Sequence, residues 1–396
     1  MDSLTQIVLG AAVGEAILGR KIGNKAMLYG AIAGTIPDLD VLASHFTDTV
    51  SALEIHRGFT HSILFTVLFS PILAFIVTKY EKYKNVKDWS WLFFWAFLTH
   101  PILDAQTTWG TQLFWPLDIR LAFKNVFVID PLYTIPFLVF LILTMLQKRT
   151  SKKRRFYNNL GLITSSSYLV ITLILKGISY QTFTKELNSQ NIKYLTIKTK
   201  PSPLNTILWT ANVETKDAFL IGHSSFFDKN PIQFSKYTKN HHLLGDLVNH
   251  DKVKRMIAIS KGWYTINKVS DTLYFNDLRF GTLSIHPNAK NFVFKYKIKV
   301  DSKGIPNFIE EPKNKKDAKK MLLELWFRIK GNIDISEWSN DEEWKAQLNP
   351  GLRRLGTIHL MGEGYWASAS WFTMVYYGKI GTLVTLRVNG CGVAYY

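Results

Sequence analysis

The chain has 396 residues, of which 47% are hydrophobic and 20% are charged. This composition excludes an intrinsically disordered chain, and a single cysteine, Cys391, excludes a disulfide framework. The formal charge of +18 favours anionic partners such as lipid headgroups, but it is too diffuse to provide a specific nucleic-acid signal.

Most long apolar runs precede Tyr180, and they predict membrane-spanning helices. A bilayer core of about 30 Å requires about 20 mostly apolar helical residues. The six predicted segments are residues 4–18, 26–36, 59–79, 89–104, 127–147 and 160–180. The first two are short and contain four-residue glycine pairs, Gly10 with Gly14 and Gly30 with Gly34. Such pairs predict close packing of two helices, either within a membrane or buried in protein.

Basic loops predict how these segments are oriented, because cytoplasmic loops are enriched in lysine and arginine. The basic residues lie between the paired segments, at Arg20, Lys21, Lys25, Lys79, Lys82, Lys84, Lys87, Lys148, Arg149, Lys152, Lys153, Arg154 and Arg155. With six segments these loops fall on one side, expected to be the cytoplasm. The N-terminus, residues 37–58, residues 105–126 and everything after Tyr180 then face outward. We therefore expect a multi-pass inner-membrane protein with an extracytoplasmic C-terminal domain.

After Tyr180 the pattern becomes that of a mostly β soluble domain. Residues 205–214, 254–267 and 291–300 mix aromatic and β-branched residues with polar ones, and turn signals separate them. Residues 315–329 predict one amphipathic helix. The predicted fold class is an α-helical membrane domain of about six apolar helices followed by this β domain. The expected boundaries are 1–183, 184–340 and a tail of unknown role at 341–396.

Ionisable residues beside membrane segments are candidate functional groups, because burying them is costly. His100 and Asp104 are four residues apart and project from one helix face, so they can chelate a metal ion or pair with each other. His56 and His61 are five apart and do not share a helix face. We expect His56 in the incoming loop and Thr60 as the cap of the helix that carries His61.

Three further charged residues lie beside these histidines in the sequence. Asp38 and Asp40 follow Pro37, where they point the same way in an extended loop and can bridge cations, or form a solvated turn. Arg57 has the planar fork that suits phosphate oxygens, or it forms a salt bridge to Asp38 or Asp40. Gly58 is expected to let the backbone turn between the two histidines of this motif.

The predicted topology brings these clusters to one depth at the outer membrane face. Histidines and aspartates together suit zinc or a similar divalent ion, and several carboxylates also fit two metals. Elsewhere, Asp130 is expected to cap a helix and Glu15 to pair with a basic residue. The remaining histidines, including His286 and the pair of His359 with Glu363, are expected to be surface or structural groups.

The motifs resemble a known family. Residues 1–6 (Met-Asp-Ser-Leu-Thr-Gln), 37–40 (Pro-Asp-Leu-Asp) and 56–62 (His-Arg-Gly-Phe-Thr-His-Ser), with His100 and Asp104, are similar to membrane-bound predicted metal-dependent hydrolases, a family grouped with zinc-dependent phospholipase C and related nucleases. The resemblance covers about residues 1–180. It implies that the metal ligands are Asp38, His56, His61, His100 and Asp104. Many members have a histidine where this chain has Gln6, and an amide is a poor zinc ligand.

The sequence therefore predicts an integral membrane hydrolase that uses zinc to activate water on an ester or phosphoester, including a lipid-like one, at the outer membrane face. Asp40 is expected to act as a general base or to support the ligands, and Arg57 to stabilise anionic charge on the substrate. The alternative is a non-enzymatic membrane metal sensor or scaffold whose β domain binds a partner. The sequence does not indicate an oligomeric state.

Overall fold

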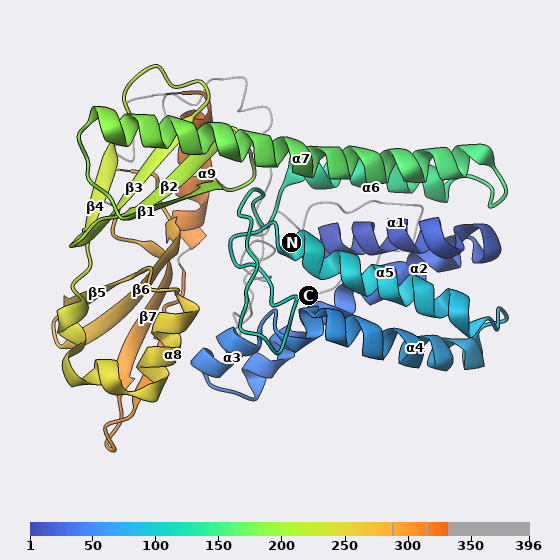
Figure 1. Ribbon diagram of the computed structural model, residues 1–396, viewed down its shortest axis with the longest axis horizontal. Coiled ribbons are helices and arrows are strands. Elements are labelled where there is room, and N and C mark those ends of the chain that lie inside the picture. Colours follow the sequence, from blue (N-terminus) through green and yellow to red (C-terminus); the bar gives the residue numbers. More distant parts are fainter. Residues whose placement is uncertain (287–288, 314, 332–396) are drawn as a thin grey trace.

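The computed structural model describes residues 1–286, 289–313 and 315–331, and it separates into a helical part and a β part (Figure 1). The helical part consists of α1 (Ser3–Ile22), α2 (Asn24–Thr35), α3 (Thr49–Ile55), α4 (Ile63–Tyr80), α5 (Val86–Asp104), α6 (Pro131–Met145) and α7 (Lys152–Ser189). Two short 3-10 segments, η1 (Ile36–His45) and η2 (Phe59–His61), connect them. Every predicted apolar segment thus overlaps an observed helix.

Three described segments are long and apolar enough to cross a membrane: Asn24–His45, Ile63–Tyr80 and Lys152–Ser189. Helix α6 is apolar but has only 15 residues. The expectation of six membrane-spanning helices is therefore not confirmed. The physical reason is that α1 contains Glu15 and two basic residues, and that α5 begins with charged side chains, so neither is uniformly apolar.

Small residues hold α1 against α2 at very short range. A Cβ atom at Gly10 would lie 2.3 Å from the carbonyl oxygen of Gly30, and one at Gly14 would lie 2.1 Å from that of Ala26. Both distances are far below van der Waals contact, so only glycine fits. The predicted close packing of the two glycine pairs is confirmed, and it fixes the position of α2 and of the η1 segment that follows it.

The predicted basic loops lie together at one end of the helical bundle. Lys21 pairs with Asp88, and Lys25 Nζ lies 2.7 Å from Glu81 Oε2. Arg149 donates to the carbonyl oxygen of Lys21 at 3.1 Å. The loops after α1, α4 and α6 therefore share one end, as the positive-inside pattern requires.

Helix α7 connects the two parts of the molecule. Its 38 residues extend for about 57 Å, which is longer than a bilayer core. It packs along α6 and then continues over the β part (Figure 1). There Phe183 and Leu187 are fully buried in a hydrophobic core with Trp209. The apolar middle of α7 was predicted, but its polar ends extend the helix in both directions.

The β part contains two antiparallel four-stranded sheets with sequential strand order. The first consists of β1 (Thr196–Pro201), β2 (Leu208–Glu214), β3 (Ala218–Ser225) and β4 (Phe234–Thr238). The second consists of β5 (Tyr264–Val269), β6 (Thr272–Thr282), β7 (Phe292–Val300) and β8 (Pro306–Glu310). Asn212 links the sheets by donating to the carbonyl oxygen of Leu278 at 2.6 Å. The mostly β character predicted for this region is confirmed.

Helices η3 (His241–Asn249), α8 (Asp251–Ile259) and α9 (Lys315–Ile329) flank the sheets. The helix predicted at residues 315–329 is confirmed as α9. The strand expected at 254–267 is wrong in its first half, which is helix α8. His250 caps that helix, and Val253 and Met256, three residues apart, give it a buried face. The predicted tail at 341–396 lies outside the described residues.

The β part covers the end of the bundle opposite the basic loops. Arg255 of α8 donates to both carboxylate oxygens of Glu54 in α3, at 2.9 and 2.5 Å. The loop between α5 and α6 lies between the two parts (Figure 1), and Lys261 Nζ donates to the carbonyl oxygen of Arg120 in this loop at 3.3 Å. The predicted site residues lie at this covered end.

Candidate metal centre

Three separate segments bring the candidate ligands together. The η1 segment begins with Pro37 in its first turn and holds Asp38, η2 ends at His61, and the last two turns of α5 hold His100 and Asp104. The expected cap at Thr60 is wrong. Ser62 caps α4 instead, because its extended backbone lets its hydroxyl accept a hydrogen bond from the amide of Phe65 at 3.0 Å.

One atom from each of Asp38, His61, His100 and Asp104 lies within 4.8 Å of all the others. His61 Nε2 is 3.3 Å from both Asp38 Oδ1 and Asp104 Oδ2. His100 Nε2 is 3.4 Å from the same two oxygens and 3.1 Å from His61 Nε2. Zinc–ligand bonds of about 2.0–2.1 Å in a tetrahedron place the ligand atoms about 3.3–3.4 Å apart. The measured spacings therefore match the edges of such a coordination shell.

The hydrogen-bond pattern leaves these four atoms with free lone pairs. His100 Nδ1 donates to the carbonyl oxygen of Gly34 at 2.6 Å, and His61 Nδ1 lies 3.3 Å from Asp40 Oδ2. With both Nδ1 atoms protonated, the two Nε2 lone pairs face each other. Asp38 Oδ1 and Asp104 Oδ2 are buried and make no hydrogen bond among the described residues, and Asp104 Oδ2 forms an ion pair with Arg57 Nε at 3.1 Å. A cation at the centre would satisfy all four atoms.

Gln6 supports the cluster without being one of its four members. Its side-chain nitrogen donates to Asp104 Oδ1 at 3.1 Å and to the carbonyl oxygen of His100 at 3.3 Å. Because both partners are acceptors, the amide nitrogen rather than the oxygen faces the cluster. The amino group of Met1 also contacts Asp104 Oδ1. These contacts hold the carboxylate so that its other oxygen points to the centre. The hydrogen bond from His100 to Gly34 could not be predicted from the sequence, because its acceptor is a backbone carbonyl oxygen.

Asp40 lies behind the cluster and connects several groups. Its Oδ1 is 3.0 Å from His56 Nδ1, and its Oδ2 accepts hydrogen bonds from the Arg57 amide at 2.7 Å and the Thr60 hydroxyl at 3.3 Å. His56, the fifth ligand that the resemblance implied, is not part of the four-atom group, and its ring centroid is 6.4 Å from that of His61. Burial lowers the pKa of His56 below its ordinary value, an effect that Asp40 partly opposes.

Arg57 places a buried positive charge beside the cluster. Its Nε is 3.1 Å from Asp104 Oδ2, and its Nη1 donates to the hydroxyl of Thr107 at 2.9 Å. The guanidinium thus pairs with Asp104 rather than with Asp38 or Asp40, the partners that the sequence suggested. The hydrogen bond to Thr107 explains this choice of partner, because Thr107 follows α5 and holds the Arg57 side chain near the end of that helix, where Asp104 lies.

The remaining sequence predictions for buried charges are confirmed. Asp130 caps α6 by accepting from the amides of Leu132 and Tyr133 at 3.0 and 3.3 Å. Glu15 forms a bidentate ion pair with Arg154, with N–O distances of 2.6 and 2.5 Å. His359 and Glu363 lie outside the described residues.

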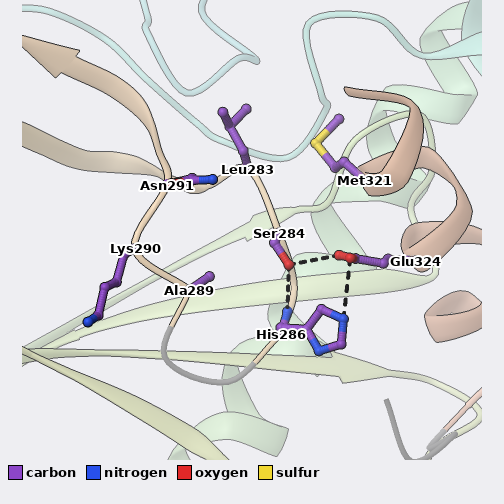
Figure 2. Close-up of a pocket in the computed structure, with 8 residues that line it drawn as sticks. All are labelled: Leu283, Ser284, His286, Ala289, Lys290, Asn291, Met321 and Glu324. Carbon is purple, nitrogen blue, oxygen red and sulfur yellow. Dashed lines mark hydrogen bonds and ion pairs between the residues drawn. The ribbon is translucent and has the colours of Figure 1, made fainter. Parts of the chain in front are cut away.

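A second polar group lies in the β part, at a cavity of about 290 Å³ that Figure 2 shows. Glu324 bridges the other two members: its Oε2 accepts from Ser284 Oγ at 2.8 Å, and its Oε1 is 3.3 Å from His286 Nε2. In a nucleophilic triad the histidine lies between the serine and the acid. Here the carboxylate occupies that position, so the arrangement gives no activated serine, and a structural role for His286 fits it.

The fold and the cluster together define a class: a protein with apolar helices that carries a buried group of two histidines and two aspartates, capped by a β domain. Residues 1–179 match the model of the YdjM inner membrane protein family. The chain is 28% identical over 112 residues to inner membrane protein YbcI of Escherichia coli (strain K12), a match covering 28% of this chain and 64% of YbcI.

A second relative is the uncharacterized protein YfhP of Bacillus subtilis (strain 168), 30% identical over 142 residues, which cover 33% of this chain and 42% of YfhP. The chain thus spans less than two thirds of the length of either relative. No solved structure matches it. The family match and the apolar helices support localisation in the inner membrane.

Proposed function

We propose that the protein is an integral membrane hydrolase that holds a divalent metal ion, zinc, and cleaves an ester or phosphoester. The observation that supports this most directly is the set of four ligand atoms on Asp38, His61, His100 and Asp104, of which five pairs are 3.1–3.4 Å apart, close to the edges of a tetrahedral zinc site. A bound zinc ion supplies Lewis acidity, which lowers the pKa of a coordinated water and polarises the substrate.

The protein groups around the cluster have separate roles in this proposal. Asp40 keeps His61 in the tautomer that presents Nε2, and it is the carboxylate nearest the cluster that is not one of the four candidate ligands, which makes it the candidate general base. Arg57 offers positive charge to an anionic substrate. Asp38 is the one partly exposed member, with 11% of its side chain accessible, whereas the other three are fully buried. Substrate and water therefore approach from the Asp38 side.

The second candidate is a metal sensor or structural site. Four protein ligands around one tetrahedral ion fill its coordination shell, as in structural zinc sites, whereas catalytic zinc usually keeps one position for water. The four-atom cluster favours this alternative if Asp38 remains a ligand of the metal ion, because no position is then left for water. Both candidates require a bound metal ion, so only a measurement of substrate cleavage distinguishes them.

Purified protein in neutral detergent distinguishes the candidates. We expect zinc-dependent cleavage of at least one substrate in a panel of phosphodiesters, phosphomonoesters and carboxylic esters, abolished by His61→Ala. His45→Ala is the matched control, because His45 is exposed at the end of η1 and outside the cluster. Bound zinc without turnover on the whole panel would support the sensor and contradict the hydrolase.

The proposed orientation places the basic loops in the cytoplasm and the β part outside. We expect a reporter joined after residue 84 to show cytoplasmic activity and one joined after residue 190 to show extracytoplasmic activity, measured with paired fluorescent-protein and alkaline phosphatase fusions. The reverse pattern would move the site to the cytoplasmic face and contradict a substrate at the outer leaflet.

A further inference from the structure

Basic side chains from distant parts of the chain meet where the loop between α5 and α6 faces the β part. We call the following residues the basic cluster: Arg120 and Lys124 from the loop, Lys176 from α7, Lys198 and Lys200 from β1, Lys261 after α8, and Arg279 from β6. None of the cluster residues in the β part lies within residues 1–179, the part that matches the inner-membrane family.

Backbone contacts hold these side chains together. Lys200 Nζ donates to the carbonyl oxygen of Arg279 at 2.6 Å, and Lys261 Nζ reaches that of Arg120 at 3.3 Å. Lys176 donates to the carbonyl oxygen of Phe123, next to Lys124 in sequence. Lys198 and Lys200 are two residues apart on β1 and point to the same face of the sheet. These main-chain contacts fix the positions of Lys176, Lys200 and Lys261 at the junction.

Carboxylates do not balance this charge. Arg279 pairs with Asp277, with an N–O distance of 2.6 Å, but the other members of the basic cluster have no carboxylate within 4.0 Å among the described residues. Two members are nearly buried, with exposed fractions of 8% for Lys200 and 7% for Arg279. Buried cations that repel each other are costly, and their summed field attracts an anion.

The pKa values of the lysines report the same imbalance. Burial, together with the neighbouring cations, lowers the pKa of Lys124 to about 7 and that of Lys200 to about 7, and it lowers the pKa of Lys198 to about 8. The charged groups that act on these three lysines are Lys124, Lys176, Lys198, Lys261, Arg279, Asp277 and Glu214. A bound anion would favour the charged lysines, so its binding is coupled to proton uptake and weakens as the pH rises through about 7 to 8.

Trp109 connects the basic cluster to the metal centre. The guanidinium carbons of Arg279 and Arg120 lie 4.9 and 5.8 Å from its ring centroid. The ring of His56 is 5.6 Å from that of Trp109, and Arg120 Nη1 donates to the carbonyl oxygen of His56 at 3.0 Å. The buried Nε1–H of Trp109 has no acceptor among the described residues. Trp109 and Arg120 of this junction thus contact both the basic cluster and His56, the hydrogen-bond partner of Asp40.

We propose that the basic cluster binds the phosphate group of an anionic ligand. This ligand is the substrate of the metal centre, and that part of the proposal rests on the proposed function. The substrate class is then a phosphoester rather than a neutral ester. A phospholipid headgroup and a soluble phosphoester present the same phosphate, so both can occupy the site. The β part acts in this proposal as the half of the site that recognises the anion.

Binding can be tested without turnover. Isothermal titration of chelator-treated protein in neutral detergent, at about pH 8, uses glycerol phosphate as the probe, which is already a dianion there because its second pKa is about 6. We expect binding with net proton uptake, detected as a difference in heat between two buffers of different ionisation enthalpy. Lys124→Gln and Lys200→Met should each weaken binding about tenfold or more and reduce the uptake. Lys299→Gln, at an exposed position of β7, is the matched control.

Each outcome bears on the proposal. The proposal would be overturned if the probe did not bind, or if sodium chloride at the same ionic strength as the probe abolished its binding. It would also be overturned if wild type and the Lys124 and Lys200 variants had equal affinity. Dihexanoyl phosphatidic acid, titrated in parallel, identifies the source: tighter binding with the same lysine dependence indicates a lipid headgroup, and equal affinity indicates a soluble phosphoester. If lysine-dependent binding persists in His61→Ala while no substrate is cleaved by wild type, the anion site stands and the hydrolase proposal fails.

Discussion

Replacing His100 with asparagine is expected to lower the affinity for zinc by roughly 100- to 1000-fold. Structural zinc sites bind with about 10–16 kcal/mol, so one of four ligands accounts for about 2.5–4 kcal/mol. Asparagine is chosen because its amide can still donate to the carbonyl oxygen of Gly34, as His100 Nδ1 does at 2.6 Å, while the Nε2 ligand atom is lost. The change thus removes the ligand and keeps the contact between α5 and α2.

Competition with a chromogenic chelator measures this affinity, and thermal unfolding provides a second measurement. Zinc at 100 times its dissociation constant stabilises the folded protein by about 2.7 kcal/mol. Wild type and the control His45→Asn should show this rise in melting temperature, and His100→Asn should not at the same zinc concentration. Equal zinc affinity in His100→Asn and wild type would show that the ion, if bound, is held elsewhere.

The helices that position this site were largely predictable because hydropathy acts locally. A run of apolar residues has to be shielded from water, so each predicted segment coincides with a helix. The spacing of His100 and Asp104 predicted a shared helix face, and both contribute to the cluster. The boundaries were less predictable. Polar residues at the ends of α7 are helical because α6 and the first sheet pack against them, and no local pattern reports those contacts.

The connection between α3 and α4 shows why the remainder of the site was not predictable. The sequence assigned the unusual backbone to Gly58, and its φ of −94° and ψ of −118° lie outside the regions that other residues adopt, but the sequence did not predict that Arg57 is left-handed, with φ of 59°. That conformation turns the Arg57 amide toward Asp40 and leaves His56 on the far side of Asp40. The histidine spacing therefore did not show which histidine joins the cluster, because the backbone of Arg57 and Gly58 sets the positions of His56 and His61.

The second large effect is expected from Arg154→Met. Arg154 and Glu15 are 3% and 7% exposed and form a bidentate pair between α7 and α1. Removing the guanidinium leaves a carboxylate that is buried against Gly19 and has lost its partner. Breaking such a pair costs about 3–5 kcal/mol in unfolding free energy. The double variant Glu15→Gln with Arg154→Met should recover part of this loss, because no net charge then remains buried.

Unfolding of the detergent-solubilised protein, followed by circular dichroism, tests this prediction against Arg155→Met, which changes the exposed neighbour in the same way. Equal stability of the two single variants, or no recovery in the double variant, would contradict it. The pair lies toward the basic-loop end of α1, whereas Gln6 contacts Asp104 near the other end. Zinc affinity of the folded Arg154→Met protein should therefore fall less than tenfold, well below the loss expected from His100→Asn. That contrast would separate residues that hold the bundle together from residues that hold the ion.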